Sequence, residues 1–580
     1  MSAGPSQHAR RGEEQRGQRH SRVRVTVADT APAWPKPAVS QDPSQRVLDE
    51  LDEHLKVWYR CHTAEREAMV NAVRWVRLNG WNVHATRFVN PPTWTWDPVP
   101  GIAHYRVRFA PPRTPALSAE TTEPRFSMAA VWKDLPDDQI DLVVEGFDDS
   151  GREACMPSWP KQFFKVPGFD GIRQEPLDWS AAARRNIAYL LEPARDADEP
   201  YERGWPRSSW SSFEDTITGQ RFRLAYPASN HPSFPMAFLC FAGLFPDDPL
   251  RAEARRQARL YGDWLLRHRQ PGNWVCGDFP YSTSEDGRPY GGKEGESITL
   301  FRSAMVGEAM IDLWKAFGDG RYFDYAKHLG QVLLRLQRAD GSWPYRVNPR
   351  DGAVVQEYTS DMIGPARLLA KLETIDPDPV YGDARRRAIG WMLDNPVRTH
   401  YWQGQFEDFG ENAPYENLEH LDADELVRYL VWFRDEIPDA VETALDVQRW
   451  VEDQFVVWQP EKSPVPVECV TPGVLEQYLC YWPMESYNAY LIMSLMSLHQ
   501  ATGDPAHLDK AVALANAVVR SQYENGAFST WGVDVRFGRP LRTDEWPGAN
   551  AWASEALLRW DRYYRAVAAG ESAGQDLLKL

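Results

Sequence analysis

The sequence predicts a mainly α-helical protein, an (α/α)6 toroid of six helical hairpins preceded by a small β-sandwich domain. Three observations predict this fold. Apolar residues recur at three- and four-residue spacing in twelve segments after about residue 170. Short and long connections alternate between these segments, and a stretch of helix, turn and aromatic residue occurs twice with the same spacing.

Length and composition are those of a soluble globular protein with several domains. The 580 residues are 43% hydrophobic and 25% charged, which suits two or three domains and a large helical core. The net charge of −17 argues against a nucleic-acid partner, because phosphate binding requires a basic surface. No stretch approaches the roughly 18 apolar residues of a membrane span, so no membrane partner is expected.

The cysteines and the N-terminus carry further expectations. The six cysteines are scattered without a C-x-x-C pair, so we expect neither a disulfide framework nor a metal site, and no organic cofactor. The N-terminus is rich in arginine but lacks the apolar core of a signal peptide, which favours a cytoplasmic location. Residues 1–40 are polar and rich in proline, which predicts a disordered tail.

Residues 41–168 are predicted to hold a helical lead-in and the β-sandwich. Apolar residues follow a helical period over 44–80. The period then changes to alternation at Tyr105, Val107 and Phe109, and a second strand runs from Ile140 to Phe147 before an Asp-Asp-Ser-Gly turn. The stretches W-x-P-V-P-G-x-x-x-Y-x-V-x-F and V-V-E-G-F-D resemble a fibronectin type III module over roughly 85 residues.

Residues 169–570 are predicted to form the toroid, and 571–580 a flexible tail. The twelve predicted helices span about 178–192, 233–245, 249–268, 300–317, 320–337, 361–373, 380–394, 421–434, 438–456, 484–502, 505–522 and 549–567.

An internal repeat supports stacked helical hairpins. In each copy a Gly-Asp pair begins a helix that ends in Gln eighteen residues after the Asp, and a turn with an aromatic residue follows. The first copy comprises Gly318-Asp319, Gln337 and Asp340-Gly341-Ser342-Trp343. The second comprises Gly503-Asp504, Gln522 and Asn525-Gly526-Ala527-Phe528.

Alternating connection lengths indicate where a site would lie. The short connections are 318–320, 374–379, 435–437 and 503–504, whereas the long ones are 269–299, 338–360, 395–420, 457–483 and 523–548. If the helices pair as hairpins round a ring, all the long connections reach one rim and lead into the N-termini of the inner helices. Long connections in compact domains usually carry function.

Together these features resemble the six-hairpin glycosidase and polysaccharide lyase superfamily. The resemblance rests on six predicted hairpins, the Q-x-x-D-G-S-W stretch at Gln337–Trp343 and an N-terminal β-module, and it covers about 400 residues. It implies a carbohydrate-active enzyme with its cleft in the toroid. No particular family matches residue by residue, so the resemblance assigns no catalytic residue.

The residues of the long connections favour glycoside hydrolysis. That reaction needs two carboxyl groups, one kept protonated as an acid and one ionised as base or nucleophile. We expect Glu419 and Glu485 to form this pair, because they lie at the ends of neighbouring long connections. The other candidate carboxylates are Glu416 and Asp422, at three-residue steps from Glu419, and Glu357 with Asp361. Capping of a helix N-terminus is the structural alternative for Asp422 and Glu485.

Aromatic residues are abundant, with 25 Trp, 23 Tyr and 23 Phe, and many Trp lie beside Gly, Pro and Asp outside any helical period. Such rings suit stacking on sugars. We expect Trp343, Trp402, Glu419, Tyr487 and Trp531 to line one pocket. The full set of predicted substrate-binding residues is Trp343, Tyr345, Arg346, Tyr358, Trp402, Tyr478, Tyr481, Asn488, Trp531 and Trp546.

Other functions remain open at this stage. A polysaccharide lyase or uronate epimerase would use His420 or Tyr487 as base, with Arg346 or Asn488 neutralising a uronate carboxylate. A non-catalytic sugar-binding scaffold would need the aromatic residues without convergent carboxylates. The Q-x-x-D-G-S-W stretch also resembles the repeat of triterpene cyclases, and Asp422–Glu425 resembles their D-x-D-D motif. It departs from that motif at the last position, and the chain has room for one helical barrel rather than two. The favoured function is hydrolysis of a poly- or oligosaccharide, for which uronic acids are among the candidate sugars.

Overall fold

The structure is a computed structural model that describes the chain from Val76 to Glu571, with gaps. The gaps are residues 77, 80–81, 83, 113–114, 193–210, 215–220, 226, 283, 286–287, 290–296, 358–360, 405–411, 461–469, 531–532, 535–538 and 541–545. The tail predicted at 1–40 and nearly all of that at 571–580 lie outside the described residues. So does the helical lead-in up to residue 75. Its end at Leu78–Asn79 is strand β1, so the prediction of a helix reaching residue 80 is wrong at that end. The described residues divide into two compact units between Lys165 and Val166.

The N-terminal unit is a two-sheet β-sandwich, as predicted. One sheet has the order β1-β3-β6 and the other β2-β8-β7-β4-β5, with β2 parallel to β8. The bounds are β1 Leu78–Asn79, β2 Arg87–Phe88, β3 Thr93–Trp96, β4 His104–Ala110, β5 Leu117–Thr121, β6 Arg125–Ser127, β7 Gln139–Phe147 and β8 Lys161–Lys165.

Alternating burial along the strands builds the core of the sandwich. In β7 every second residue is buried, which is the period of a strand with one face covered. Trp94 and Trp96 of the smaller sheet share one apolar cluster with Val107, Val144 and Phe163 of the larger sheet. The predicted strands at 105–109 and 140–147 are therefore confirmed, whereas the fibronectin type III resemblance stays a prediction.

The C-terminal unit contains twelve α-helices among its described residues, which confirms the predicted set. They are α4 Trp179–Leu191, α5 Pro227–Leu244, α6 Arg251–Arg267, α7 Leu300–Phe317, α8 Gly320–Leu336, α9 Ile363–Ile375, α10 Pro379–Met392, α11 Leu421–Trp432, α12 Ala440–Phe455, α13 Glu485–Thr502, α14 Pro505–Arg520 and α15 Pro547–Ala568. Helix α5 begins six residues before the predicted start, and Pro232 and Pro235 lie inside it.

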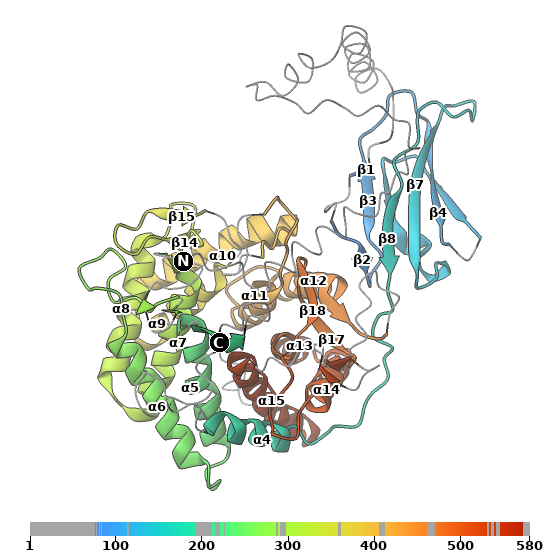
Figure 1. Cartoon of the computed structure of the whole chain (residues 1–580). Helices are drawn as coiled ribbons and strands as arrows, with labels where there is room; N and C mark the ends of the chain where they lie inside the picture. The colour runs from blue at the N-terminus through green and yellow to red at the C-terminus, as the bar shows by residue number, and fades with distance from the viewer. Residues whose placement is uncertain are drawn as a thin grey trace. The chain divides into compact units, whose positions relative to one another are not determined.

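The helices form a closed double ring (Figure 1). Helices α5, α7, α9, α11, α13 and α15 each pack against the next, and α15 packs against α5 to close the inner ring. Each inner helix forms a hairpin with an outer one, and α4 packs against α15. Because one antiparallel outer helix separates successive inner helices, all the inner N-termini share one end. The long connections lead into these N-termini, so the (α/α)6 toroid is confirmed.

Short strands occur within the long connections. They are β9 Ser211–Glu214, β10 Arg221–Ala225, β11 Ser284–Glu285, β12 Arg288–Pro289, β13 Ile298–Thr299, β14 Arg346–Val347, β15 Val354–Gln356, β16 Val456–Val457, β17 Gly473–Gln477, β18 Cys480–Pro483, β19 Val533–Asp534 and β20 Arg539–Pro540. Strand β13 pairs with β14, and β16 pairs with β17, so the strands join successive connections or brace a single one.

The sequence repeat closes the hairpins. Gly318 and Gly503 end α7 and α13 with φ values of 69° and 68°, a left-handed conformation that glycine adopts readily. Asp319 and Asp504 then cap the following outer helices through their side chains.

The second half of the repeat docks each turn on the next hairpin. Gln337 Nε2 donates to the carbonyl oxygens of Gly341 and Ala384, and Gln522 Nε2 donates to those of Gly526 and Ala182. Ala384 lies in α10 and Ala182 in α4. The two copies therefore join neighbouring hairpins by the same contacts.

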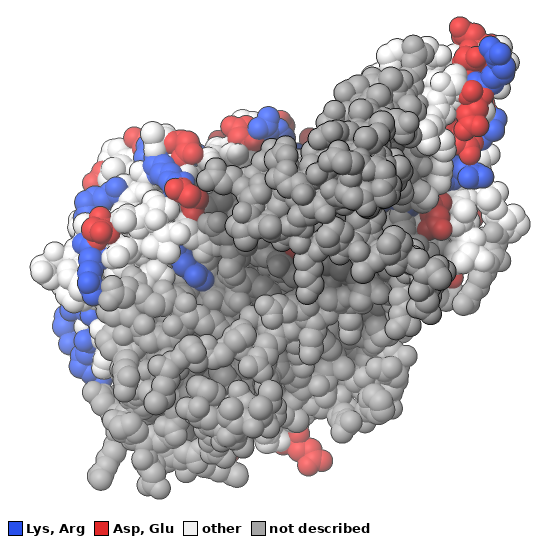
Figure 2. Space-filling model, turned by 45° about the horizontal axis from the view of Figure 1, so that its top comes forward, with Lys and Arg blue, Asp and Glu red and all other residues white. Residues whose placement is uncertain are grey.

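No helix among the described residues is long and apolar enough to span a membrane. On the face drawn in Figure 2, the described Lys and Arg side chains are interspersed with Asp and Glu side chains.

Candidate active site

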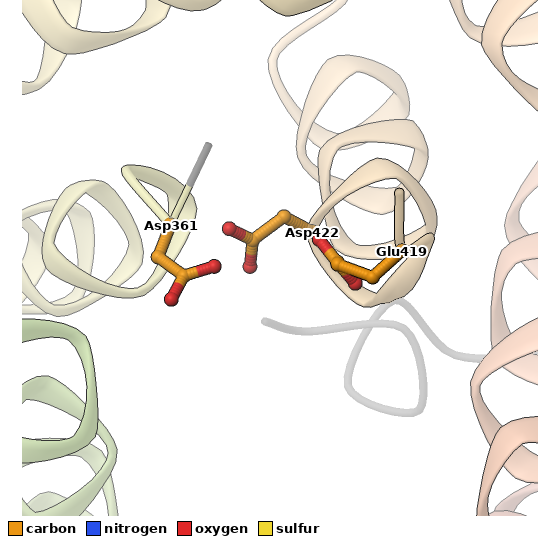
Figure 3. Close-up of side chains that lie close together, drawn as sticks. All are labelled: Asp361, Glu419 and Asp422. Carbon is orange, nitrogen blue, oxygen red and sulfur yellow. The ribbon is translucent and has the colours of Figure 1, made fainter. Parts of the chain in front are cut away.

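Three carboxyl groups meet at the N-terminal ends of two neighbouring inner helices. Asp361 lies two residues before α9, Glu419 two residues before α11, and Asp422 is the second residue of α11. One oxygen atom of each carboxyl lies within 4.8 Å of one oxygen of each of the others. Figure 3 shows the side chains of Asp361 and Asp422 pointing toward one another from the two helices. We refer to these three residues as the carboxyl cluster.

The main chain holds Glu419 firmly. Its N–H donates to the Trp402 carbonyl oxygen at 2.9 Å, and the residue forms a bridge to Gln477 of β17. Tyr478 N–H donates to the Leu418 carbonyl oxygen at 3.0 Å. The Glu419 carboxylate in turn accepts a hydrogen bond from Leu421 N–H at the start of α11. The position of Glu419 is therefore fixed by two long connections at once.

Burial sets the protonation of the cluster. Glu419 and Asp422 are 2% and 1% exposed. Burial, followed by the nearby Asp361 carboxyl, holds the pKa of Glu419 and that of Asp422 well above their usual ranges. Three carboxyls this close do not all ionise near neutral pH, so the cluster retains at least one proton. A hydrogen bond between the side chains of Asp361 and Asp422 raises the pKa of Asp422 further.

The spacing of the carboxyl cluster could also hold a divalent cation. Ca²⁺ binds carboxylate oxygens, but it takes six to eight oxygen ligands in all. Leu421 N–H donates to Glu419, and the N-terminal ends of α9 and α11 present positive partial charge to the same place. These groups stabilise negative charge without a metal, so the donor set fits a carboxyl pair better than a cation site.

Two cavities lie beside the cluster along the ring axis. A small one of about 20 Å³ touches Asp422, which is room for about one water. A larger one of about 410 Å³ shares several of its lining residues. The shared residues are Met236, Arg367, Glu425, Tyr490 and Trp552.

Sequence reasoning missed the residues of these cavities. Tyr490 of α13 and Trp552 of α15 have ring centroids 5.4 Å apart and are only partly buried, whereas most of their neighbours along each helix are buried. In the sequence they lie within a helical apolar period, which indicates core. The placement of Arg367 and Glu425 inside inner helices was the one available hint, because charged residues are seldom buried without a purpose.

The ring of His420 is fully engaged. Its Nδ1 lies 2.8 Å from Asp424 Oδ2, and its Nε2 lies 3.0 Å from the carbonyl oxygen of Leu475. Asp424 also accepts a hydrogen bond from Ser494 Oγ. Both ring nitrogens therefore have partners within the fold, and neither is available to take a proton from a substrate.

The structure places the other predicted acids away from the carboxyl cluster. Glu485 is buried near the C-terminal end of α14, where the Ser521 side chain and the Arg520 charge act on it, and burial raises its pKa to about 8. Glu357 is exposed and forms an ion pair with Arg338. Glu416 accepts a hydrogen bond from Ala413 N–H. The Glu419 carboxyl thus lies beside those of Asp361 and Asp422, whereas the Glu485 carboxyl lies beside the C-terminal end of α14.

Several predicted sugar-binding aromatics are fully covered. Trp343 Nε1 donates to the Leu333 carbonyl oxygen, and Tyr478 Oη donates to Gln454 Oε1. Their rings, like those of Tyr345 and Trp402, are at most 2% exposed, so as placed they offer no open face for a sugar. Tyr487 Oη lies 3.5 Å from Glu476 Oε1.

The remaining predicted binding residues have mixed placements. Arg346 is partly buried on β14 with its guanidinium 5.1 Å from the Tyr345 ring, and Asn488 accepts a hydrogen bond from Val474 N–H. Trp546 precedes α15 and donates its N–H to Thr530 Oγ1. Tyr358, Trp531 and the side chain of Tyr481 lie outside what the structure describes.

Glu485 makes stability depend on pH. Its folded-state pKa of about 8 lies above that of an unfolded glutamate, so its contribution is fully present below about pH 4.5 and is lost as pH rises through about 8. We expect Glu485→Gln to match the wild type in melting temperature near pH 4.5 and to exceed it by several degrees at pH 8. Melting curves of both proteins across this range measure the difference. A constant difference at all pH values would contradict the assigned pKa.

Comparisons with known proteins give similarity in chain trace only. The chain matches no protein-family model and no curated protein. Among solved structures it is similar to a family 76 glycoside hydrolase from a bovine Bacteroides thetaiotaomicron strain, with 10% identity, 84% of this chain and 98% of that chain covered, and a TM-score of 0.45. It is also similar to cellobiose 2-epimerase from Bacillus thermoamylovorans, with 11% identity, 66% of this chain and 98% of that chain covered, and a TM-score of 0.47. A third similar structure is a D-mannose isomerase, with 11% identity, 68% of this chain and 100% of that chain covered, and a TM-score of 0.48.

Proposed function

We propose that the chain is a glycoside hydrolase whose reacting groups are the carboxyls of Asp361, Glu419 and Asp422. The observation that supports it is the meeting of three carboxyl oxygens within 4.8 Å at the inner-helix N-termini, where burial keeps a proton on the cluster. Glycoside hydrolysis requires this combination of a protonated and an ionised carboxyl in one place.

Within this proposal Asp422 is the general acid. It is buried, and it lines the smaller of the two cavities on the ring axis. It would donate its proton to the leaving oxygen of the glycosidic bond. Asp361, which is less buried, would be the ionised partner that attacks the sugar carbon. The negative charge of Asp361, more than that of Glu419, would keep Asp422 protonated before the reaction.

The spacing of the carboxyls favours retention of configuration. Retaining enzymes hold their two carboxyls about 5–5.5 Å apart, and inverting enzymes about 6.5–9.5 Å apart to admit a water. One oxygen of each carboxyl in the cluster lies within 4.8 Å of one oxygen of the others, which is nearer to the retaining than to the inverting separation. The substrate would be a poly- or oligosaccharide, since Phe301, Tyr490 and Trp552 beside the cluster suit the apolar face of a sugar ring.

The geometry gives less support to a lyase or an epimerase with a histidine base. Such an enzyme needs an imidazole with a free nitrogen facing the substrate. Both nitrogens of His420 are held by Asp424 and Leu475.

A screen on polysaccharides tests the reaction class. We expect new reducing ends without the ultraviolet absorbance of an unsaturated uronate, because hydrolysis adds water across the bond. Reducing ends together with that absorbance would show a lyase. Conversion between epimers without new reducing ends would show an epimerase, and either result would overturn the proposal.

A further inference from the structure

The larger axial cavity has an unusual charge balance. It lies one to four turns beyond the inner-helix starts, on the side away from the carboxyl cluster. Five cationic and three anionic side chains line its volume of about 410 Å³. The cations are Lys315, Arg367, Lys371, Arg428 and Arg559, and the anions are Asp312, Glu425 and Glu555.

Shared ion pairs leave positive charge in surplus. Glu308, just behind the lining, pairs with both Arg367 and Lys371, and Glu425 pairs with both Arg367 and Arg428. Two carboxylates therefore serve three cations. Burial, together with the neighbouring Arg367 and Arg559 charges, lowers the pKa of Arg428, while the Glu425 carboxylate opposes this shift.

Unpartnered polar atoms belong to residues that line the same cavity. Among the described residues, Arg367 Nε, Arg428 Nε and Glu555 Oε2 have no hydrogen-bond partner, and these side chains are more than nine-tenths buried. Buried polar groups are normally satisfied, so these exceptions mark an unusual polar environment in the wall of the cavity, although the three atoms themselves are covered and do not open on it. Two guanidinium donors suit an oxyanion, and a carboxylate oxygen suits a hydroxyl group.

Aromatic side chains form part of the apolar lining of this cavity. Tyr490 and Trp552, which make a tilted ring pair, line this cavity as well as the smaller one. Cavities that bind small molecules combine an apolar and aromatic lining with a few polar groups that fix orientation. The cavity of about 410 Å³ falls in the range of such sites and is large enough for one sugar ring with a charged substituent.

We propose that the axial cavity binds an anionic monosaccharide, a hydroxylated ring that carries a phosphate or carboxylate group. Arg367 and Arg428 hold the anionic group, Glu555 accepts from a ring hydroxyl, and Tyr490 and Trp552 cover the ring. The site shares Tyr490 and Trp552 with the sugar-binding surface of the proposed function but contains none of the three reacting carboxyls, so binding without turnover tests it.

Calorimetric titration of the full chain tests this site with four probes: glucose 6-phosphate, glucuronate, glucose and inorganic phosphate. We expect glucose 6-phosphate or glucuronate to bind, with the stronger one identifying the anionic group, and glucose and inorganic phosphate to bind at least about tenfold more weakly, because each lacks one half of the recognised chemistry. The proposal is overturned if neither anionic sugar binds, or if glucose or inorganic phosphate binds as tightly.

Variants locate the binding. Arg428→Gln is expected to weaken binding of the anionic sugar about tenfold or more, because it removes a charged donor. The ion pair between Glu425 and Arg367 remains in this variant. Lys371→Met provides a second variant should Arg428→Gln not fold, because it removes a cation that lines the cavity while Glu308 keeps Arg367, and it is also expected to weaken binding of the anionic sugar. Arg256→Gln is the matched control, an exposed cation on α6 paired with Glu253. Equal affinity in the wild type and both cavity variants would place the ligand elsewhere and refute the assignment.

Discussion

Asp422→Asn is expected to lower kcat by about 10³-fold or more while leaving the fold intact, since general acid–base groups contribute about 10²–10⁴-fold. Asparagine keeps the volume of aspartate but cannot donate an acidic proton to a leaving oxygen. Asp361→Asn is expected to have an effect of similar size, because the attacking carboxylate is lost. Initial rates on the polysaccharide identified by the screen, with circular dichroism as a check on folding, measure both effects.

Glu485→Gln and Glu357→Gln are matched controls for this loss. Each removes one carboxyl by an isosteric change, and the structure places Glu485 against α14 and Glu357 at the surface with Arg338. We expect both to keep kcat within about threefold, because the groups neither touch the cluster nor face the axial cavity. Full activity in Asp422→Asn, or a large loss in Glu485→Gln, would move the reacting pair away from the carboxyl cluster.

Arg367→Met is expected to lower the free energy of unfolding by about 3–5 kcal/mol, the usual cost of removing one partner from a buried ion pair. Arg367 pairs with Glu308 at 2.9 Å and also with Glu425, and all three side chains are less than a tenth exposed. Methionine preserves the aliphatic packing but leaves the two carboxylates with only Lys371 and Arg428 as partners. Urea unfolding measures the difference.

Arg386→Met is the control for the stability effect. Arg386 pairs with Asp383 at 2.7 Å, but these side chains are 53% and 64% exposed. Exposed pairs contribute about 0–1 kcal/mol, so a small change is expected. Equal losses in the two variants would show that the axial ion pairs add nothing particular to the stability of the ring.

The sequence by itself determined the architecture of this protein. Twelve helical periods, the alternation of connection lengths and the Gly-Asp repeat predicted the toroid, because each depends on neighbours along the chain. Gly318 and Gly503 take the left-handed conformation that ends a helix, and Asp319 and Asp504 cap the next one. Glu419, Asp422 and Asp361 could also be identified as candidates, since carboxylates at the starts of inner helices point to one rim.

Only the tertiary structure decided which candidates meet. Glu419 and Glu485 lie before or at the start of neighbouring inner helices, yet the first joins Asp361 and Asp422 and the second turns to Ser521 and Arg520. Which way a side chain points at a helix start depends on the rotation of the helix about its axis, which packing sets.

The aromatic residues show the same limit. Trp343 belongs to the repeat that docks one hairpin on the next, so its ring is covered and its Nε1 is bonded to Leu333. Tyr490 and Trp552 have the sequence pattern of core residues but line the axial cavity, because inner helices of a ring cannot fill its centre completely. Local periodicity thus specifies which face of a helix is apolar. Whether that face meets another helix or an open cavity depends on contacts between residues far apart in the chain.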